Sequence, residues 1–462
     1  MHLPNPLKTP SFLQKLQWVL DPIGYMENAV KQYPDIFTTK VVDFADTPIF
    51  VNHPQAIQEI LTDRNKFAAL GEANRILQPL LGDYSILMLS GNHHKRRRQL
   101  LMPPFHGERM RAYGELICHL AEKVFSQLPL DKQFSSRSML QEISLRVMLQ
   151  AVFGLHEGER CEKIKRLMLL LLDVFRSPLT SSLFFFSFLQ KDLGAWSPWG
   201  KFLRQRQQMD KLLYAEIAER RQQPDPDRID ILSLLMSAQD EAGQPMNDLE
   251  LRDELMTLLF GGHESTATAM SWALYWIHHK PEVKEKLLQE LDTLGVSPDP
   301  MSIFRLPYLT AICNETLRIY PVTPSTLSRV VQEKVELLGH PLEPGMIVVP
   351  CIYLTHHRED LYPEPKQFRP ERFLERQFSP YEFLPFGGGA RGCIGQTLAL
   401  FEMKLVLATI LSRYQLALVD QQPEPPLRQG LTIAPANGAK MVITGRRVRP
   451  NSPVAIATTS VF

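Results

Sequence analysis

The cysteine at position 393 follows a glycine-rich segment and precedes a helical pattern. Residues 386–395 read FGGGARGCIG, and apolar residues then recur at helical spacing from Gln396 to Tyr414. Cys393 is therefore expected at a helix N-terminus, where the helix dipole and free backbone N–H groups stabilise a thiolate. A thiolate is the form of cysteine that binds iron, and glycines let the backbone wrap closely around a flat ligand. From the residues alone, an anion site at this helix start is an alternative.

A second group of chemically active side chains interrupts a long apolar segment, 247–280. Asn247 and Glu250 have the spacing of a capping box and Pro281 ends the pattern, which predicts one buried helix of ~50 Å. Residues 261–266, in its middle, read GGHEST. Two glycines, an acid and hydroxyl groups are unfavourable at the centre of a buried helix unless they are used. We therefore predict a functional site at this point of the helix.

Composition excludes several classes of protein. The chain has 462 residues, 44% of them hydrophobic, and a net charge of +1, so no global field favours nucleic acid or acidic substrates. Its five cysteines are widely spaced and form no CxxC pair, which argues against a disulfide framework and a zinc ribbon. The N-terminus lacks the apolar core of a signal peptide, and charges and a proline interrupt the apolar segment 167–189. We expect a soluble cytoplasmic protein, with peripheral membrane contact through 167–189 left open.

Most of the remaining pattern is helical, with a few short β-type runs. Residues 36–42 and 49–51 are expected to be strands. Residues 335–338 and 346–349 are expected to form a hairpin about the turn at Pro344 and Gly345. The last residues, 446–462, are polar and rich in small side chains, which is typical of a flexible tail.

Five motifs together resemble those of the cytochrome P450 superfamily. The haem-binding signature is matched by Phe386, Gly389, Arg391, Cys393 and Gly395. Residues 315–318 (ETLR) resemble the ExxR motif of helix K, and 368–373 (FRPERF) resemble the segment that follows it. Residues 261–266 resemble the oxygen-activating motif of helix I, and 91–98 (GNHHKRRR) the helix C segment that contacts a haem propionate. The resemblance covers about residues 4–444, and around helices I, K and L it is similar to cyanobacterial members of the soluble bacterial type.

The resemblance implies a mainly α fold with a smaller β region, a single domain of residues 1–462 around a buried haem b. Cys393 would bind the haem iron, with Phe386 and Gly395 shaping the loop around it. The candidates for contact with the haem propionates are His94, Arg98, Arg329 and Arg391. A buried structural lock, in which one carboxylate lies between two guanidinium groups, would be formed by Glu315, Arg318 and Arg372.

The resemblance also assigns the chemistry of oxygen activation. Glu264 and Ser265 match the acid–alcohol pair that delivers protons, with Thr266 beside them; the family usually has Thr where Ser265 stands, so the β-branch is lost. His263 is expected to pack away from the iron. The residues expected to line the substrate pocket are Leu77, Leu258, Gly261, Gly262, Val322, Thr323, Ser325 and Thr432.

These matches imply a haem-thiolate monooxygenase that uses O₂ to hydroxylate a hydrophobic small molecule, a fatty acid or a terpenoid. Two electrons would come from a separate ferredoxin and its reductase, and some of Lys95, Arg96 and Arg97 are predicted to form the surface that docks this donor. Alternatives are a haem-thiolate peroxygenase or a hydroperoxide-rearranging enzyme, which the retained acid–alcohol pair and the ordinary loop length disfavour. A non-catalytic haem sensor is less favoured, because it would have no use for a proton relay.

Overall fold

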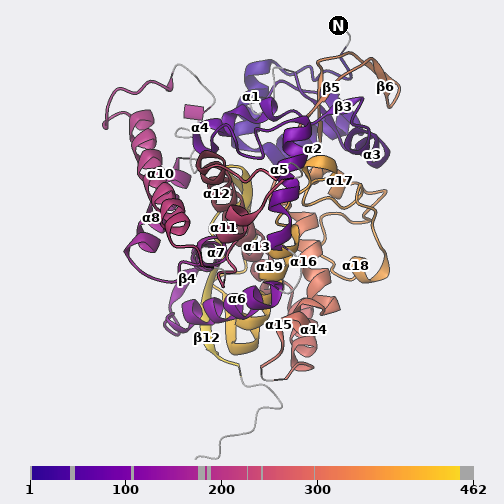
Figure 1. The fold of residues 1–462 in the computed structure, drawn as a ribbon. Helices are drawn as coiled ribbons and strands as arrows, with labels where there is room; N and C mark the ends of the chain where they lie inside the picture. Colours follow the sequence, from indigo (N-terminus) through magenta and orange to yellow (C-terminus); the bar gives the residue numbers. More distant parts are fainter. Residues whose placement is uncertain are drawn as a thin grey trace, which may run out of the picture.

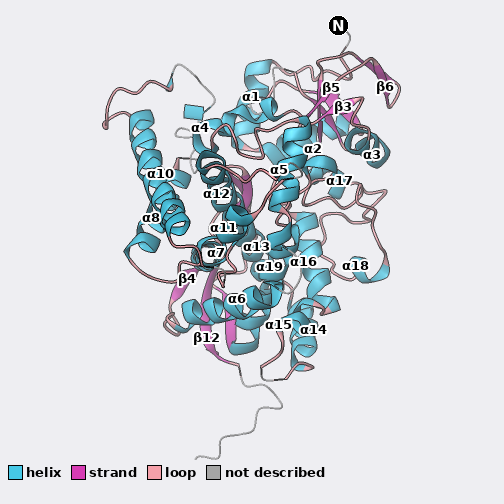
Figure 2. Ribbon diagram, viewed as in Figure 1, coloured by secondary structure: helices cyan, strands magenta, loops and turns pink. Residues whose placement is uncertain are grey.

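Helices make up most of the molecule, and short strands gather mainly at its upper right and lower ends (Figures 1 and 2). The computed structural model describes residues 3–41, 47–105, 109–174, 183–184, 189–225, 227–240, 243–295 and 297–447. The helices are α1 (Ser11–Leu20), α2 (Pro22–Gln32), α3 (Pro54–Thr62), α4 (Gln78–Leu81), α5 (Gly91–Leu101), α6 (Arg109–Ser126), α7 (Ser136–Phe153), α8 (Glu159–Asp173), α10 (Pro198–Gln222), α11 (Ile231–Ser237), α12 (Asp248–Gly262), α13 (Glu264–His279), α14 (Pro281–Asp292), α15 (Pro300–Phe304), α16 (Pro307–Ile319), α17 (Ile352–His356), α18 (Arg372–Glu375) and α19 (Gln396–Arg413). Short 3₁₀ helices are η1 (Gly71–Leu77), η2 (Pro103–Phe105) and η4 (Gly389–Arg391). The strands are β1 (Ile36–Thr38), β2 (Ile49–Val51), β3 (Phe67–Ala68), β4 (Gln133–Ser135), β5 (Arg329–Val331), β6 (Val335–Leu337), β7 (His340–Leu342), β8 (Ile347–Pro350), β9 (Tyr414–Leu418), β10 (Pro426–Gln429), β11 (Thr432–Pro435) and β12 (Lys440–Arg446).

The long helix predicted for 247–280 is two helices, α12 and α13. Its start is confirmed, because the Asn247 side chain accepts a hydrogen bond from the Glu250 N–H at 3.0 Å and the Glu250 carboxylate accepts one from the Asn247 N–H at 2.9 Å. Its end is confirmed too, since Pro281 opens the next helix. The prediction of one continuous helix is wrong at His263, where the backbone (φ −101°, ψ −45°) separates the two.

Hydroxyl groups and glycines explain the break at His263. The hydroxyls of Ser265 and Thr266 donate to the carbonyl oxygens of Gly261 and Gly262 at 2.7 and 3.0 Å. Side chains that bond to carbonyls one turn back compete with the helical ladder, and the two glycines weaken it further. The break therefore falls where the sequence places its unfavourable residues.

Helix α13 is the centre of the molecule and packs against α7, α16, α19 and β11. Its Trp272 is fully buried and donates its indole N–H to the carbonyl oxygen of Ile433 on β11 at 2.9 Å. The end of α12 is also held tightly, since a Cβ on Gly262 would lie 2.5 Å from the Met148 side chain on α7. The α12–α13 junction is thus fixed between packed helices.

The larger sheet has the strand order β1-β2-β8-β5-β3, which confirms the strand predicted for 49–51. The strand predicted for 36–42 is present but ends earlier, at Thr38. The predicted hairpin is wrong, because β6 pairs with β7 whereas β8 pairs with β2 and β5. The turn between β6 and β7 is made by Leu338 and Gly339, whose φ values of 52° and 76° are both positive, as a tight two-residue hairpin turn requires. The turn at Pro344 and Gly345 instead leads into β8.

Strand β12 lies in the middle of the sheet β4-β12-β9 and corrects the predicted start of the C-terminal tail. Arg446 ends this strand, and the Arg447 guanidinium pairs with the Asp292 carboxylate at 2.6 Å. The tail predicted for 446–462 therefore begins too early, because its first residues are held by a strand and an ion pair. Residues 448–462 lie outside the described part of the chain.

All five cysteines are free, so none takes part in a disulfide. Within the ranges given above, every helix is too short or too polar to cross a bilayer.

Candidate active site

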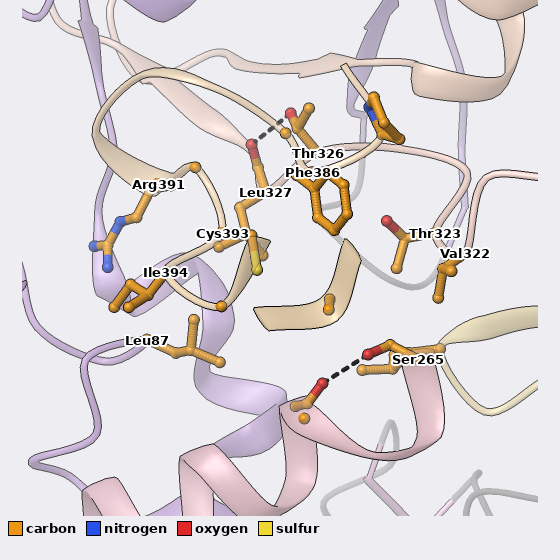
Figure 3. A pocket seen from close by; sticks show the side chains of 18 of the residues that line it. Leu87, Ser265, Val322, Thr323, Thr326, Leu327, Phe386, Arg391, Cys393 and Ile394 are labelled. Atoms are coloured by element: carbon orange, nitrogen blue, oxygen red, sulfur yellow. Dashed lines mark hydrogen bonds between the residues drawn. The ribbon is translucent and has the colours of Figure 1, made fainter. Parts of the chain in front are cut away.

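Two glycines in the left-handed region shape the loop that holds Cys393. Gly387 and Gly389 have φ values of 67° and 62°, and a Cβ on Gly389 would lie 2.4 Å from the carbonyl oxygen of Leu61. The Cys393 N–H donates to the Phe386 carbonyl oxygen at 2.9 Å and closes the loop. Helix α19 starts three residues later, as predicted. In Figure 3 the sulfur points out of the loop into a cavity.

The environment of the Cys393 sulfur has two opposing parts. Burial raises the pKa of the thiol, whereas the N–H of Gly395, the Arg98 guanidinium and the N–H of Gln396 oppose that rise. The N–H groups predicted for the helix start are in place, but in the chain alone burial outweighs them. A coordinating metal cation deprotonates a thiol outright, so the sulfur suits a metal ligand.

Four basic side chains converge beside this loop and line the same cavity as Cys393. His94 and Arg98 lie one turn apart on α5, Arg329 is at the start of β5, and Arg391 is at the end of η4. All four were predicted from the sequence as partners of an acidic ligand. The structure brings them together from three separate parts of the chain.

The guanidinium groups of this basic cluster are satisfied by main-chain oxygens. Arg98 donates to the Gly392 carbonyl oxygen at 2.6 Å. Arg329 donates to the Leu327 carbonyl oxygen at 2.7 Å, and Arg391 to that of Ile86 at 2.8 Å. Across the described ranges, no ion pair joins these arginines to a carboxylate. Burial, followed by the charges of Arg391, Arg98 and Arg329, lowers the pKa of His94 to about 4. Like charges held together in a buried wall favour a ligand with more than one negative charge.

A cavity of about 510 Å³ lies between the cysteine loop and the α12–α13 junction (Figure 3), a volume within the range of small-molecule sites. The predicted pocket residues that line it are Leu77, Leu258, Gly261, Gly262, Val322, Thr323 and Ser325. Thr432 lies apart from these, on a smaller cavity of about 190 Å³ that shares several of the same walls. Further apolar residues complete the lining, among them Ile86, Leu87, Ala269 and Leu398.

The predicted acid–alcohol pair lies in the wall between the two cavities. Ser265 lines both, whereas Glu264 lines only the smaller one. The Ser265 hydroxyl donates to the Gly261 carbonyl oxygen, and the Glu264 carboxylate accepts from Gln141 at 2.6 Å and pairs with Arg137. The Ser265 hydroxyl therefore faces the larger cavity, which holds Cys393, whereas the Glu264 carboxylate faces only the smaller cavity.

The two neighbours of this pair differ in where they face. Thr266 lines the larger cavity. His263 is fully buried, and its Nδ1 lies 3.0 Å from the Leu259 carbonyl oxygen. It lines neither cavity, which agrees with the prediction that it packs away from the chemistry.

The profile of the cytochrome P450 family matches residues 4–441 of the chain. This chain is a cytochrome P450. Cytochrome P450 135B1 of Mycobacterium tuberculosis is 35% identical to it over 449 residues, covering 97% of this chain and 92% of the relative. Cytochrome P450 135A1 of the same organism is 31% identical over 447 residues, covering 96% of each. Members of the family are haem-dependent monooxygenases, so this P450 is an oxidoreductase of that class.

Two solved structures share the fold of this P450. A cyanobacterial CYP120A1 with retinoic acid bound matches with a TM-score of 0.83 and 24% identity, covering 96% of this chain and 100% of the other. The haem domain of cytochrome P450DA matches with a TM-score of 0.82 and 23% identity, covering 96% and 98%. The predicted fold, mainly α with a smaller β region, is confirmed.

The residues around the larger cavity of this P450 fit a haem. A haem has a metal ion, a flat apolar ring and two propionates. Cys393 offers the sulfur ligand, and the glycine turn at Gly387 lets the backbone lie close to a ring. Arg98, Arg329 and Arg391 offer positive charge that has no carboxylate partner in the part of the chain that the structure describes.

The structural lock predicted in this P450 is assembled. Glu315 accepts from Nε and Nη2 of Arg318 at 2.7 and 2.8 Å and from Nε of Arg372 at 3.0 Å. All three side chains are almost completely buried. Arg318 also donates to the His356 carbonyl oxygen at 2.8 Å. The cluster joins α16 to α17 and α18, which precede the cysteine loop in the chain.

The predicted docking role of the basic run needs a correction. Arg97 is buried, and its guanidinium bonds to Glu250 at 2.5 Å and to Glu254 at 2.8 Å. It therefore holds α5 to α12 and is inaccessible to a partner protein. Arg96 is exposed and pairs with Asp240. The spacing of Glu250 and Glu254, one turn apart on a helix, was the signal that an internal cation lies opposite.

Among the cavity residues that sequence reasoning missed are Trp18, Glu254 and Glu402. Glu254 precedes Leu258 by one turn of α12 and Gly261 by two turns. This spacing places it on the same side of the helix as those two cavity residues. Glu402 faces inward from α19, whose pattern is apolar on most sides. Trp18 reaches the cavity from the N-terminal helix, for which no motif gave a signal.

Proposed function

We propose that this P450 hydroxylates a hydrophobic small molecule, a fatty acid or a terpenoid, at a haem b bound through Cys393. One observation carries the proposal: the larger cavity is mostly apolar and lies between the cysteine sulfur and Ser265. The wall that follows α16 adds scattered hydroxyl groups, from Thr323, Ser325, Thr326 and Ser328. Retinoic acid, which the cyanobacterial structure holds, is a ligand of the same apolar kind.

When bound, the haem supplies the activation of O₂ that leads to insertion of one oxygen atom into a C–H bond. The chain does the rest. Leu87, Leu258 and Val322 hold an apolar substrate and exclude water. The Ser265 hydroxyl holds a proton at the cavity wall, and the Glu264 carboxylate replenishes it from the smaller cavity.

The first experiment is the absorption spectrum of the reduced, carbon-monoxide-bound protein and of the Cys393→His variant. We expect a strongly red-shifted Soret band in the wild type and its loss in the variant, because only a thiolate ligand produces that shift. A wild-type Soret band typical of histidine-ligated haem would contradict the assignment of Cys393.

Spectral titration with a panel of fatty acids and terpenoids tests the substrate class. A bound substrate that displaces water from the iron shifts the Soret band, and hydroxylated product should then form with O₂ and reducing equivalents. Formation of product only with hydrogen peroxide, with none from O₂ and NADPH, would instead support the peroxygenase. Tight haem binding without turnover of any substrate would support the sensor.

The Ser265→Ala variant tests the proton relay. Losing the hydroxyl at the wall of the larger cavity should divert electrons to hydrogen peroxide, so the ratio of product to NAD(P)H consumed should fall on the order of tenfold. Ser265→Thr restores the hydroxyl and is the control. An unchanged ratio in Ser265→Ala would remove Ser265 from the relay.

The electron donor is proposed to be a ferredoxin with its reductase, docking on the exposed side of α5. With Arg97 buried, Lys95 and Arg96 are the exposed cations of that run. Lys95→Glu should slow stopped-flow reduction several-fold at low salt, and less at high salt, because docking is electrostatic. Equal rates at both salt concentrations would move the docking surface elsewhere. The single-domain organisation of residues 1–462 and the cytoplasmic location remain predictions.

A further inference from the structure

Helix α1 buries the polar Gln14 beside Trp18 and exposes most of its other apolar side chains. Gln14 is 1% exposed, whereas Phe12, Leu16 and Leu20 are 70%, 44% and 60% exposed. At 3.6 residues per turn, the three exposed residues lie within an arc of about 90° on one face. A surface helix of a globular protein normally has the opposite arrangement.

The hydrogen bonds of Gln14 fix this orientation. Its Nε2 donates to the Thr9 carbonyl oxygen at 2.7 Å. Its Oε1 accepts from the Tyr25 hydroxyl at 2.9 Å and from the Lys40 N–H at 2.8 Å. Rotating α1 to bury its leucines would break these bonds inside the protein, so the apolar side stays outside.

A second apolar patch precedes α10. Trp196 is 80% exposed and Leu193 is 55% exposed, which makes Trp196 the most exposed large apolar side chain of the described residues. In Figure 1 the magenta segment before α10 and helix α1 both lie along the upper edge of the molecule. Tryptophan is enriched where an apolar phase meets water.

Positive charge flanks both patches. Residues 3–20 contain no acidic side chain, and Lys8 and Lys15 there are exposed. Around Trp196, Lys191 and Lys201 are exposed, and the acidic Asp192 pairs with Arg204 at 3.1 Å. Apolar side chains flanked by lysines are the combination that binds the surface of an anionic bilayer.

We propose that the apolar face, formed by Phe12, Leu16, Leu20, Leu193 and Trp196, docks on the surface of an anionic lipid bilayer. The docked side chains enter only the interfacial layer. This docking would also place one end of the larger cavity close to the bilayer.

The helix that carries half of this face also reaches the active site. Trp18 on α1 and Pro22 at the start of α2 line the larger cavity. A protein docked through the apolar face would hold that end of the cavity beside the lipid. If the substrate is apolar, as proposed above, this arrangement lets it pass from the bilayer to the cavity without crossing water. The docking itself does not depend on the identity of the substrate.

The test is co-sedimentation of the haem-loaded, full-length protein with vesicles of phosphatidylcholine containing phosphatidylglycerol. We expect the wild type to bind, and both the double variant Phe12→Ser/Leu16→Ser and the single variant Trp196→Ser to lose affinity on the order of tenfold. Vesicles of phosphatidylcholine alone should bind more weakly. Leu374→Ser is the matched control, because Leu374 is 52% exposed on α18, away from this face, and should leave binding unchanged.

Unchanged carbon-monoxide spectra and far-ultraviolet circular dichroism establish that each variant is folded. Failure of the wild type to sediment with either vesicle would overturn the docking, as would equal losses in Leu374→Ser and Trp196→Ser. Equal binding to both vesicle types would overturn the anionic preference. Self-association of the wild type that Phe12→Ser/Leu16→Ser abolishes, without vesicle binding, would assign the face to a second copy of the chain instead.

Discussion

Glu402 is a buried acid whose Oε1 has no hydrogen-bond partner within the described chain. It lies on α19, is 1% exposed, and has Ser144 of α7 beside it. Burial raises its pKa from 4.5 to about 8. The folded protein therefore favours the neutral acid at neutral pH, whereas the unfolded chain favours the carboxylate.

This difference predicts a pH-dependent gain from Glu402→Gln. Because the raised pKa makes the folded state bind the proton more tightly, stability is lost as pH rises from about 4.5 to about 8. Between these two pH values, the free energy of unfolding of the variant should rise relative to that of the wild type. The difference should reach on the order of 5 kcal/mol near the higher pH and stay constant above it. Urea unfolding at several pH values measures it.

The exposed Glu285 on α14 provides the control, since Glu285→Gln should change the free energy of unfolding little at any pH. A constant difference between Glu402→Gln and the wild type across the window would mean that Glu402 is ionised in the folded protein.

Resemblance to the motifs of the cytochrome P450 family was enough to predict the cysteine loop, the basic cluster and the structural lock. Without that resemblance, residue types and spacing left an anion site at the cysteine loop as an alternative. Arg97 was misassigned because its burial depends on Glu250 and Glu254, which lie far along the chain. Glu402 was missed because an acid within an apolar helix gives no sign of which neighbours it will have.

At the scale of elements, the cysteine loop depends on backbone conformations that only glycine adopts easily. Gly387→Ala should cost about 1–2 kcal/mol, because it adds left-handed strain with its nearest new contact at 3.9 Å. Gly389→Ala should cost a further ~1–3 kcal/mol, because its Cβ would also meet the Leu61 carbonyl oxygen. Urea unfolding of the two variants measures the difference. Equal destabilisation would mean that α3 moves aside freely.

The ends of elements were predicted better than their continuity. The capping box at Asn247 and the stop at Pro281 are local and were readable from the sequence. The break at His263 depends on hydroxyls that bond to carbonyls one turn back, and helical periodicity runs straight through it. The wrong hairpin has a similar origin: two turns, at Gly339 and Gly345, were available, and sheet pairing decided which one joins adjacent strands.

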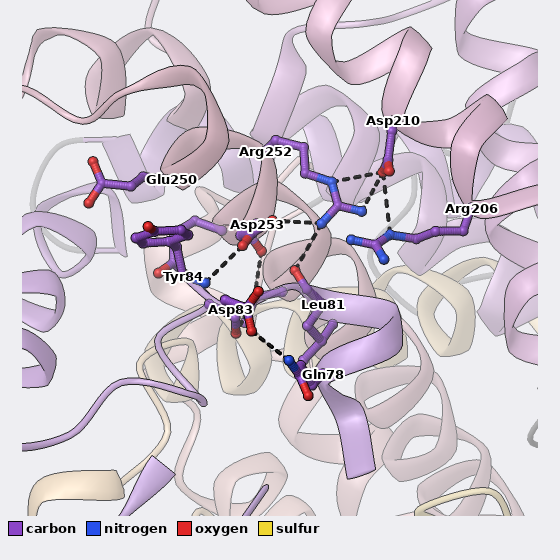
Figure 4. A network of polar contacts seen from close by, with 12 residues as sticks. Gln78, Leu81, Asp83, Tyr84, Arg206, Asp210, Glu250, Arg252 and Asp253 are labelled. Carbon is purple, nitrogen blue, oxygen red and sulfur yellow. Dashed lines mark hydrogen bonds and ion pairs between the residues drawn. The ribbon is translucent and has the colours of Figure 1, made fainter. Parts of the chain in front are cut away.

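At the scale of the whole molecule, an ion network joins α10 and α12 to the segment that begins with α4 (Figure 4). Asp210 on α10 accepts from Nε of Arg252 at 2.7 Å and lies 3.4 Å from Nε of Arg206. Arg252 also bonds to Asp253 at 2.6 Å, and Asp253 accepts from the Tyr84 N–H at 2.8 Å. One side of the cavity is thus tied to α10 through charges.

Weakening this network should loosen α10 without unfolding the protein. In Asp210→Asn the buried Arg252 keeps Asp253 but loses the carboxylate that ties it to α10, so amide hydrogen exchange in α10 should accelerate about tenfold or more. Hydrogen–deuterium exchange with mass spectrometry of peptides from α10 measures this.

Asp192→Asn is the matched control, because Asp192 lies just before α10 and pairs with Arg204 on that helix. Both side chains are nearly half exposed, and such pairs contribute little. Equal protection of α10 in wild type and Asp210→Asn would show that apolar packing alone holds this helix.

The whole-molecule arrangement was the least accessible from sequence. The motifs fixed the family and therefore the order of helices, but not which side chains connect them. The network of Asp210 and Arg252 joins residues that no motif contains. The larger cavity likewise draws Trp18 from one end of the chain and Cys393 from near the other.

The basic cluster has a consequence for how the protein is made in a cell. Without a dianionic guest, the three guanidinium groups must be brought together against their mutual repulsion, so the newly synthesised polypeptide has one region that resists closing. A ligand that binds only the folded form raises the folded fraction by mass action. Cofactor supply should therefore limit the yield of intact protein, and cells short of haem should clear much of this polypeptide by proteolysis before it matures.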